Sequence, residues 1–410
     1  MTTQTIETRA SWVVASVSLV LAAVAFGALW IVAVGLKTIA ADLGGARSAP
    51  SLASSLAWLG SSVGGLMMGP LAERYGVRST VIFGAVSICI GLFISQLGET
   101  WQLYLGHGLF IGLLGTAGLN APLYIYVSRW FDRRRGSALA LLSSGLYLAG
   151  TVWPPIFERA IAMVGWRMTM LAYGVLVAAV IVPLAVVFLK QAPETPTATG
   201  ATVVPGETPH VFGWPPNVVF GLLVAAAFLC CVTMSMPQNH LVALCSDLGY
   251  SAQSGAAMLS LLLGVGVLTR QIWGAIADRI GGLSTLLISS LLQGLAMTGF
   301  VVTQDEWGLY GVAAAFGAGF SALIPAYVLA VREYFPAREA SWRVPVVLLL
   351  SGSGMSTGTW LAGALYDYFG FYAPAFAVGV AFNIANFIVL ATLILRRRHY
   401  TGASAGAIPA

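Results

Sequence analysis

The sequence predicts an all-α membrane protein with twelve transmembrane helices arranged as two pseudo-symmetric six-helix bundles. Three observations support this fold class: the composition, the spacing of the apolar stretches and an internal repeat. The chain of 410 residues is 58% hydrophobic and only 9% charged, with a mean hydropathy of +0.86, whereas soluble domains carry about 25% charged residues. We therefore expect the chain to cross a membrane many times.

Twelve apolar stretches are long enough to span a bilayer as helices. The first six cover about 11–36, 51–71, 79–97, 102–128, 137–160 and 166–190, and the second six cover about 214–238, 251–277, 282–303, 307–331, 344–366 and 371–395. Residues 191–213 contain four prolines with several threonines and glycines, which is typical of a linker. The predicted domains are an N-terminal bundle at 1–190, a cytoplasmic linker at 191–213, a C-terminal bundle at 214–396 and a cytoplasmic tail at 397–410.

The two halves are related in sequence. Adding 205 to a residue number aligns them without a gap over residues 42–80. A parallel repeat of this kind predicts two similar bundles, with a substrate site near the middle of the membrane between them. Four glycines in the second span, at 60, 64, 65 and 69, also suggest close approach to a neighbouring helix. The aligned residues include Asp42-Leu43-Gly44 with Asp247-Leu248-Gly249, Ala72-Glu73-Arg74 with Ala277-Asp278-Arg279, and Gly76 with Gly281.

The distribution of basic residues predicts the orientation. If the N-terminus is cytoplasmic, fifteen of the twenty Lys and Arg residues lie in cytoplasmic segments, as expected from the excess of basic residues in such loops. Both termini are therefore predicted to be cytoplasmic, with the protein in a bacterial-type inner membrane. The same distribution explains the net charge of +5, so no nucleic-acid partner is needed.

The sequence predicts neither an enzyme nor a cofactor or metal site. No two titratable residues share a predicted depth in the membrane core, as an intramembrane catalytic pair would require, and no loop of the GxxxxGK(S/T) type is present. The four cysteines form no CxxC pair. The expected partners are a small organic anion, membrane lipid, and either protons or a counter-anion, and the chain is expected to work as a monomer.

Arg270 is the charged residue that we expect within the membrane. It lies eight residues before Asp278, which is about 12 Å of helix rise. A charge at that depth costs roughly 2.5–3.5 kcal/mol on insertion scales and commonly marks a functional site. Its repeat counterpart is Gly65, so the scaffold does not require a charge. A guanidinium binds a carboxylate through two parallel hydrogen bonds, which favours an anionic substrate; the alternative is an arginine that snorkels or binds backbone carbonyls.

Other polar residues are candidates to complete the site. Asn120 and Tyr124 follow Thr116 at steps of four residues, which predicts one polar stripe on the fourth span. Leu148 in the fifth span and Tyr327 in the tenth are further candidates for substrate contact, with helix packing as the alternative role. His240, near the outer end of the seventh span, is a candidate proton carrier because imidazole titrates near physiological pH; the alternative is a polar residue in a helix-end turn.

The loop after the second span carries a recognisable motif. Residues 69–78, GPLAERYGVR, resemble the signature Gly-x-x-x-(Asp/Glu)-Arg-x-Gly-x-(Arg/Lys) of the major facilitator superfamily, and 274–281 resemble a degenerate second copy. The resemblance covers nearly the whole chain and implies rocker-switch alternating access. It also implies a conformational latch, for which a charged turn that only fixes orientation is the alternative. The residues assigned to gating on this basis are Glu73, Arg74, Arg78, Asp278 and Arg279.

Within that superfamily, three segments resemble the monocarboxylate porters and the bacterial oxalate/formate exchangers: Arg270, the stretch 119–122, and the loop 129–135 with the helix that follows it. The resemblance implies that Arg270 binds the substrate carboxylate while Asn120 and nearby residues orient it. The chain departs from the porters at Gly266, where they commonly carry an Asp, and from the exchangers in having no basic residue within 344–365. One cation favours monocarboxylates such as lactate or pyruvate, with dicarboxylate exchange and multidrug efflux as alternatives; symport and antiport both stay open.

Overall fold

The structure is a computed structural model that describes residues 7–131, 134–189 and 211–405. The described chain is helical, apart from one isolated bridge between Val211 and Trp214 and the short turns between helices. The predicted linker lies mostly outside the described residues. The N-terminal half contains α1 (Arg9–Gly27), α2 (Ile31–Asp42), α3 (Ser48–Tyr75), α4 (Val77–Ser95), α5 (Thr100–Leu105), the π-helix η1 (Gly106–Thr116), α6 (Ala117–Ser128) and α7 (Arg135–Phe188).

The C-terminal half repeats this plan. It contains α8 (Pro216–Asp247), α9 (Ala252–Ile280), α10 (Gly282–Val302), α11 (Glu306–Phe320), α12 (Leu323–Tyr334), α13 (Ala337–Phe369) and α14 (Ala373–Ala405). In each half one span is broken: α1 and α2 form the first span, and α11 and α12 form the tenth. The last helix continues beyond residue 396, where the sequence placed the end of the bundle.

The number of spans agrees with the prediction. Ten helical stretches of the described chain are long and apolar enough to cross a membrane. One of them, α7, consists of two helices joined at Gly165, and α3 adds a further helix of 28 residues. Counting these gives twelve spans and confirms the predicted all-helical fold class. The helices extend beyond the apolar stretches because their polar ends remain helical outside the hydrocarbon core.

The backbone confirms the internal repeat. Three pairs of glycines separated by 205 residues adopt positive φ angles, which glycine accepts without steric penalty. The first pair marks the end of α2 and of α8, the second ends α3 and α9, and the third ends the helix before each half's last span. Their φ angles are 99° and 87° for Gly44 and Gly249, 86° and 79° for Gly76 and Gly281, and 79° and 83° for Gly165 and Gly370. The gapless register therefore extends well beyond the residues whose identities match.

Glycines bring α3 against the π-helix. An ideal Cβ on Gly60 would lie 2.4 Å from the carbonyl oxygen of Gly108, and one on Gly64 would lie 2.2 Å from that of Leu113. The predicted close approach is thus confirmed at these two positions. It is wrong at Gly65, where a Cβ would meet nothing within 4 Å, because that residue faces away from η1. The sequence did not predict the π-helix, a rare element that often occurs at functional sites.

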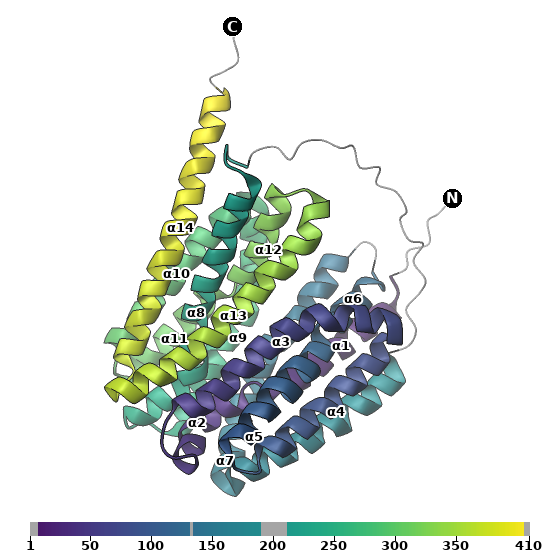
Figure 1. Cartoon of the computed structure of the whole chain (residues 1–410), viewed down its shortest axis with the longest axis vertical. Coiled ribbons are helices and arrows are strands. Elements are labelled where there is room, and N and C mark those ends of the chain that lie inside the picture. Colours follow the sequence, from purple (N-terminus) through teal and green to yellow (C-terminus); the bar gives the residue numbers. More distant parts are fainter. Residues whose placement is uncertain (1–6, 132–133, 190–210, 406–410) are drawn as a thin grey trace.

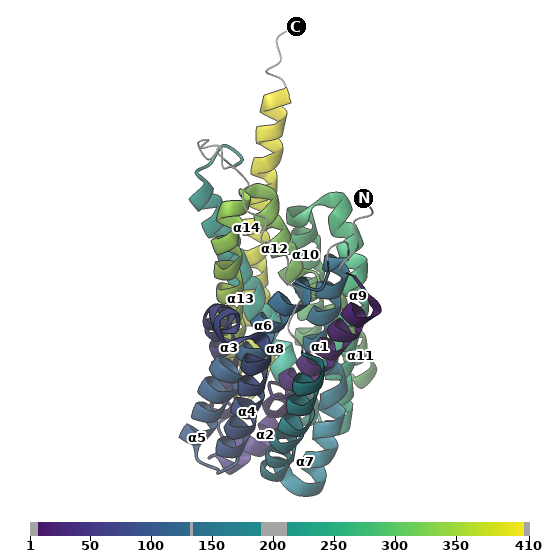
Figure 2. The same ribbon diagram turned by 90° about the vertical axis from the view of Figure 1, so that its right-hand side faces the viewer.

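The two bundles lie side by side (Figure 1). The main contacts between them are made by α3 with α13, α7 with α9, and α2 with α8. Viewed from the side, the start of α1 and the end of α14 lie toward the upper ends of their bundles, whereas α2 and α5 lie below (Figure 2). The repeat thus produces an interface between the halves, which is where residues of a transport site are expected.

Adding a methyl group to two adjacent glycines should separate packing from other effects. We expect Gly64→Ala to lower the stability of the detergent-solubilised protein by about 1–3 kcal/mol, since its Cβ would overlap a backbone carbonyl. Gly65→Ala is the matched control and should leave the melting temperature, measured by intrinsic fluorescence, at the wild-type value or slightly above it. Equal melting temperatures for both variants would contradict this packing of α3 on η1.

Candidate substrate-binding site

Arg270 lies on α9 at the interface between the halves. Its guanidinium carbon is 4.9 Å from the centre of the Tyr147 ring on α7, within the range of a cation–π contact. It also interacts with the side chains of Tyr147 and Tyr124. Among the described residues, no Asp or Glu forms an ion pair with Arg270. The structure therefore holds a guanidinium against the Tyr147 ring, without a carboxylate counter-charge among the described residues.

The ring of Tyr147 packs against two helices of the C-terminal half. It stacks on Phe320 of α11, with ring centres 5.7 Å apart and an interplanar angle of 18°. On α9, an ideal Cβ at Gly266 would lie 3.2 Å from the Tyr147 ring. The ring thus occupies the space in which a larger side chain at 266 would stand. This accounts physically for glycine where the monocarboxylate porters commonly carry an Asp.

Asn120 and Tyr124 both lie on α6, but in different surroundings. Asn120 is exposed, whereas Tyr124 is partly buried and lies close enough to Arg270 to interact with it. Thr116, at the end of η1, is buried and donates to the carbonyl of Gly112, so the predicted polar stripe does not extend to it. The structure brings Tyr124 to Arg270, and contact of Asn120 with substrate stays a prediction.

Leu148 lines a cavity of about 490 Å³ between α1, α7 and α9. Tyr327 lies elsewhere, within the C-terminal half. It is 1% exposed, and its hydroxyl donates to Asn386 Oδ1 at 3.0 Å. Asn386 in turn donates to Ser290 Oγ. Tyr327 therefore belongs to a buried polar network, and its predicted contact with substrate would require that network to rearrange.

His240 is fully buried on α8. Its Nε2 lies 2.8 Å from the carbonyl oxygen of Thr359, and its Nδ1 lies 3.0 Å from the hydroxyl of Tyr372. Because a carbonyl only accepts, Nε2 carries the proton and donates; in the neutral ring, Nδ1 accepts from the tyrosine hydroxyl. The side chain thus links α8 to α13 and to the turn that precedes α14. Its role in proton coupling stays a prediction.

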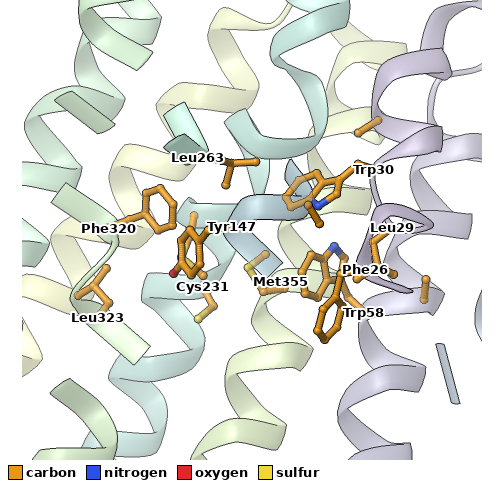
Figure 3. Packing of buried hydrophobic residues seen from close by; sticks show 14 of the residues in the cluster. Phe26, Leu29, Trp30, Trp58, Tyr147, Cys231, Leu263, Phe320, Leu323 and Met355 are labelled. Carbon is orange, nitrogen blue, oxygen red and sulfur yellow. The ribbon is translucent and has the colours of Figure 1, made fainter. Parts of the chain in front are cut away.

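A layer of buried apolar side chains fills part of the interface between the halves (Figure 3). Leu263 of this layer precedes Arg270 by seven residues on α9, toward the end of the helix that follows α8. Tyr147 lies beside Phe320 and Cys231 in this layer, while Trp30 faces Trp58 (Figure 3) with ring centres 6.3 Å apart. Leu263 of α9 reaches across to the other half, since an ideal Cβ on Gly150 would lie 2.1 Å from it. The halves are therefore packed tightly on this side of Arg270.

Beyond this layer, a cluster of charges fastens the halves together. Arg47, at the start of α3, is 5% exposed and donates two hydrogen bonds to Asp247, at the end of α8, with lengths of 2.5 and 2.6 Å. Lys37 lies 3.2 Å from the same carboxylate. Asp367 accepts from the backbone N–H groups of Arg47 and Ser48 at 2.7 and 2.9 Å, so it caps α3. We call Arg47, Asp247 and Asp367 the ionic latch.

The aromatic residues of the C-terminal half complete the latch. The guanidinium carbon of Arg47 lies 3.6 Å from the centre of the Tyr366 ring and 5.2 Å from that of Tyr372. Burial acts to lower the pKa of Arg47, but the interactions with Asp247 and Tyr372 together outweigh that effect and raise the pKa above its ordinary value. Since Tyr372 also contacts His240, the latch and the buried histidine are neighbours.

The repeat shows why the latch crosses between halves. Asp42, the counterpart of Asp247, pairs within its own half with Arg167 at 2.6 Å and accepts from Trp166 at 2.9 Å. The residue equivalent to Arg167 is Tyr372, so Asp247 has no cation at that position in its own half. It pairs instead with Arg47 of the other half.

The residues assigned to gating lie at the opposite end. Glu73 pairs with Arg129 at 3.7 Å, both exposed and both in the N-terminal half. Arg78 donates to the carbonyl of Val186 in the same half. Among the described residues, no ion pair or hydrogen bond joins the halves through the signature motif at 69–78 or its second copy at 274–281. Arg74 belongs to the first segment, and Asp278 and Arg279 belong to the second. Their gating role stays a prediction.

Sequence reasoning missed the latch and the Tyr147–Phe320 stack. Tyr147 was visible on one face of the fifth span with Leu148, but no pattern indicated its contact with Arg270. The latch had a detectable signal: the aligned aspartates Asp42 and Asp247 differ in whether a basic residue follows at the aligned position, Arg167 or Tyr372. Among the described residues, no group of three or more His, Cys, Asp or Glu side chains could hold a metal ion.

Two related six-helix bundles with a cation between them are typical of a secondary transporter. The chain belongs to the Major Facilitator Superfamily, whose model matches residues 18–340 and again 222–409. It is accordingly a multi-pass membrane transporter and not an enzyme, and proteins of this superfamily bind small substrates.

Its relatives differ in what their names describe. The chain is similar to MFS transporter asaE of Aspergillus flavus, with 24% identity over 73% of this chain and 67% of the relative. It is also similar to monocarboxylate transporter 13 of Bos taurus, with 28% identity over 84% and 79%. The Fujikurins efflux protein of Gibberella fujikuroi is 23% identical over 81% and 70%.

Solved structures share the fold. A mutant of the peptide transporter POT in complex with alafosfalin superposes with a TM-score of 0.73 at 14% identity, covering 93% of this chain and 94% of that one. A mutant of the nucleoside transporter NupG gives a TM-score of 0.69 at 11% identity, covering 92% and 99%. These similarities establish the major facilitator fold.

Replacing one carboxylate of the ionic latch should weaken the contact between the halves at the latch end of the interface. We expect Asp247→Asn to weaken the closed state by on the order of 2 kcal/mol, since it leaves Arg47 without its charged partner. Spin labels on cysteines introduced at Ala46 and Tyr368, exposed on opposite halves, should then show a larger population at long distance.

Asp42→Asn is the matched control, because this aspartate pairs inside one half. It should leave the distance distribution unchanged. Identical distributions for Asp247→Asn and wild type would show that the latch does not hold this end closed.

Proposed function

We propose that the protein is a secondary transporter of small organic anions, specifically monocarboxylates such as lactate or pyruvate. The observation that carries this proposal is Arg270, which lies at the interface between the halves against Tyr147 and has no carboxylate partner among the described residues. A carboxylate substrate would supply the counter-charge through two parallel hydrogen bonds. Tyr124, which lies within electrostatic range of the guanidinium, and Asn120 would orient it.

The proposal includes an orientation in the membrane. With both termini in the cytoplasm of a bacterial-type inner membrane, the ionic latch would lie on the outer side and the motif around Glu73 on the inner side. The latched structure would then be an inward-facing state of the rocker-switch cycle. The substrate would reach Arg270 from the cytoplasm, while the aromatic layer would close the path outward.

The energy source is tested by transport in proteoliposomes. Uptake of radiolabelled lactate would be measured with and without an inward proton gradient, and into liposomes preloaded with unlabelled carboxylate. Stimulation by the gradient would establish symport and make His240 the residue to test as proton carrier. A requirement for internal carboxylate would establish exchange, which agrees with an interface that holds no acidic residue beside Arg270 in the described chain.

Efflux of larger organic compounds is the second candidate function. It is supported by the relatives named as efflux proteins in fungi. Transport of a neutral or cationic compound that persists without Arg270 would favour this candidate, because such a compound would not need the guanidinium.

Removing the guanidinium should abolish anion transport. We expect Arg270→Ala to reduce lactate uptake to the level of empty liposomes, since the carboxylate would lose its charged partner. Arg332→Ala, which removes an exposed arginine at the end of α12, is the control for reconstitution and charge and should transport normally. Wild-type uptake by a folded Arg270→Ala protein would contradict the proposed function.

Adding a carboxylate beside Arg270 should weaken the binding of an anionic substrate. Residue 266 lies one turn before Arg270, so we expect Gly266→Asp to provide an internal partner for the guanidinium that competes with substrate. The apparent substrate constant should increase by about tenfold or more, which corresponds to at least 1.4 kcal/mol. Gly266→Asn places a side chain of nearly equal size against Tyr147 and measures the steric part alone. If both variants raise the constant equally, charge competition is not the cause.

A further inference from the structure

The cavity of about 490 Å³ between α1, α7 and α9 lies beside the proposed carboxylate site. It is at the interface of the two halves, since α1 and α7 belong to one and α9 to the other. Its volume falls within the range of about 300–1,000 Å³ typical of ligand pockets. Its apolar lining includes Trp12, Leu19, Leu141, Leu148, Val267 and Leu268.

The cavity and Arg270 share the same helices at adjacent positions. Val267 lies one turn before Arg270 on α9, and residues three apart lie on the same face of a helix. On α7, Leu148 follows Tyr147, whose ring contacts the guanidinium. An acid whose carboxylate binds Arg270 could therefore place its hydrocarbon part in this apolar cavity.

We propose that this cavity is a subsite for the apolar tail of the substrate, which rests on the proposed function of monocarboxylate transport. The substrate class is then an amphiphilic monocarboxylate, whose carboxylate binds Arg270 and whose tail lies among Trp12, Leu148 and Val267. Lactate and pyruvate are too small to fill the space. A lipid acyl chain carries no charge that could pair with the guanidinium of Arg270, so charge complementarity favours such an acid as the occupant.

The polar residues of the lining are compatible with an alkyl tail. Three polar side chains, Ser137, Ser144 and Gln271, border the apolar lining. Ser144 already donates to the carbonyl of Ala140 at 3.0 Å, so its hydroxyl does not require a partner from the substrate. An unbranched alkyl chain can therefore bind without leaving that hydroxyl unsatisfied.

A homologous series of acids tests the subsite. Unlabelled straight-chain monocarboxylates from propionate to octanoate would compete with the uptake of radiolabelled lactate into proteoliposomes. We expect the inhibition constant to fall by about fourfold for each added methylene until the cavity is filled, in keeping with the burial of each group. Alcohols of the same length, which enter membranes but lack the carboxylate, should not compete in this range.

Two variants test whether the tail of the substrate binds in this cavity. Val267→Phe fills part of the cavity and should flatten the dependence on chain length. Leu295→Phe is the matched control, because Leu295 lies on α10 and is 62% exposed on the outside of the bundle; it should keep the wild-type dependence.

The outcomes separate the two proposals. If the wild type takes up no lactate, the proposed function fails. If lactate is taken up but the inhibition constant is independent of chain length, or Val267→Phe keeps the full dependence, the subsite alone is overturned. Equal inhibition by octanol and octanoate would also overturn it, because the cavity would then take alkyl chains without regard to Arg270.

Discussion

The pairing of charge at the interface between the halves is the interaction on which the rest of the structure depends. Arg47 is buried and fully partnered: Asp247 accepts two hydrogen bonds from its guanidinium, Asp367 accepts from its backbone, and Tyr366 covers its face. Arg270 lies at the same interface with an aromatic ring but no carboxylate among the described residues. A charge removed from water needs a partner. One arginine thus fastens the halves, while the other has no carboxylate partner among the described residues and, under the proposed function, binds the substrate anion.

The internal repeat explains how one scaffold supports both roles. Equivalent positions keep the same backbone geometry, as the paired glycines at 76 and 281 show, while their side chains diverge. Asp42 is satisfied inside its own half, whereas Asp247 pairs across the interface. Likewise Gly65 faces open space at the position equivalent to Arg270. Asymmetric substitutions on a symmetric backbone therefore place the ionic latch and Arg270 at the interface while equivalent turns keep the same backbone geometry.

Sequence reasoning predicted what depends on local pattern. Apolar length predicted the twelve spans, and the gapless register predicted the two related bundles, because both follow from hydrophobicity and residue identity along the chain. It also identified Arg270, since a charge in an apolar run stands out. It missed the contact of Tyr147 with Arg270 and the pair formed by Arg47 and Asp247, which join residues far apart in sequence. Those contacts depend on how the halves dock, and a single sequence carries no direct signal of that docking.

The proposed function gives the unpaired guanidinium a role in coupling. In the transport cycle the interface must close on both sides of Arg270 at some stage, which removes the guanidinium from water. Without substrate that step leaves a charge buried against Tyr147 alone, whereas a bound carboxylate neutralises it and lowers the desolvation penalty. The loaded carrier would therefore cross the occluded state more readily than the empty one. Such a difference favours exchange of one anion for another over the return of an empty carrier, unless a proton on a residue such as His240 changes the balance of charge.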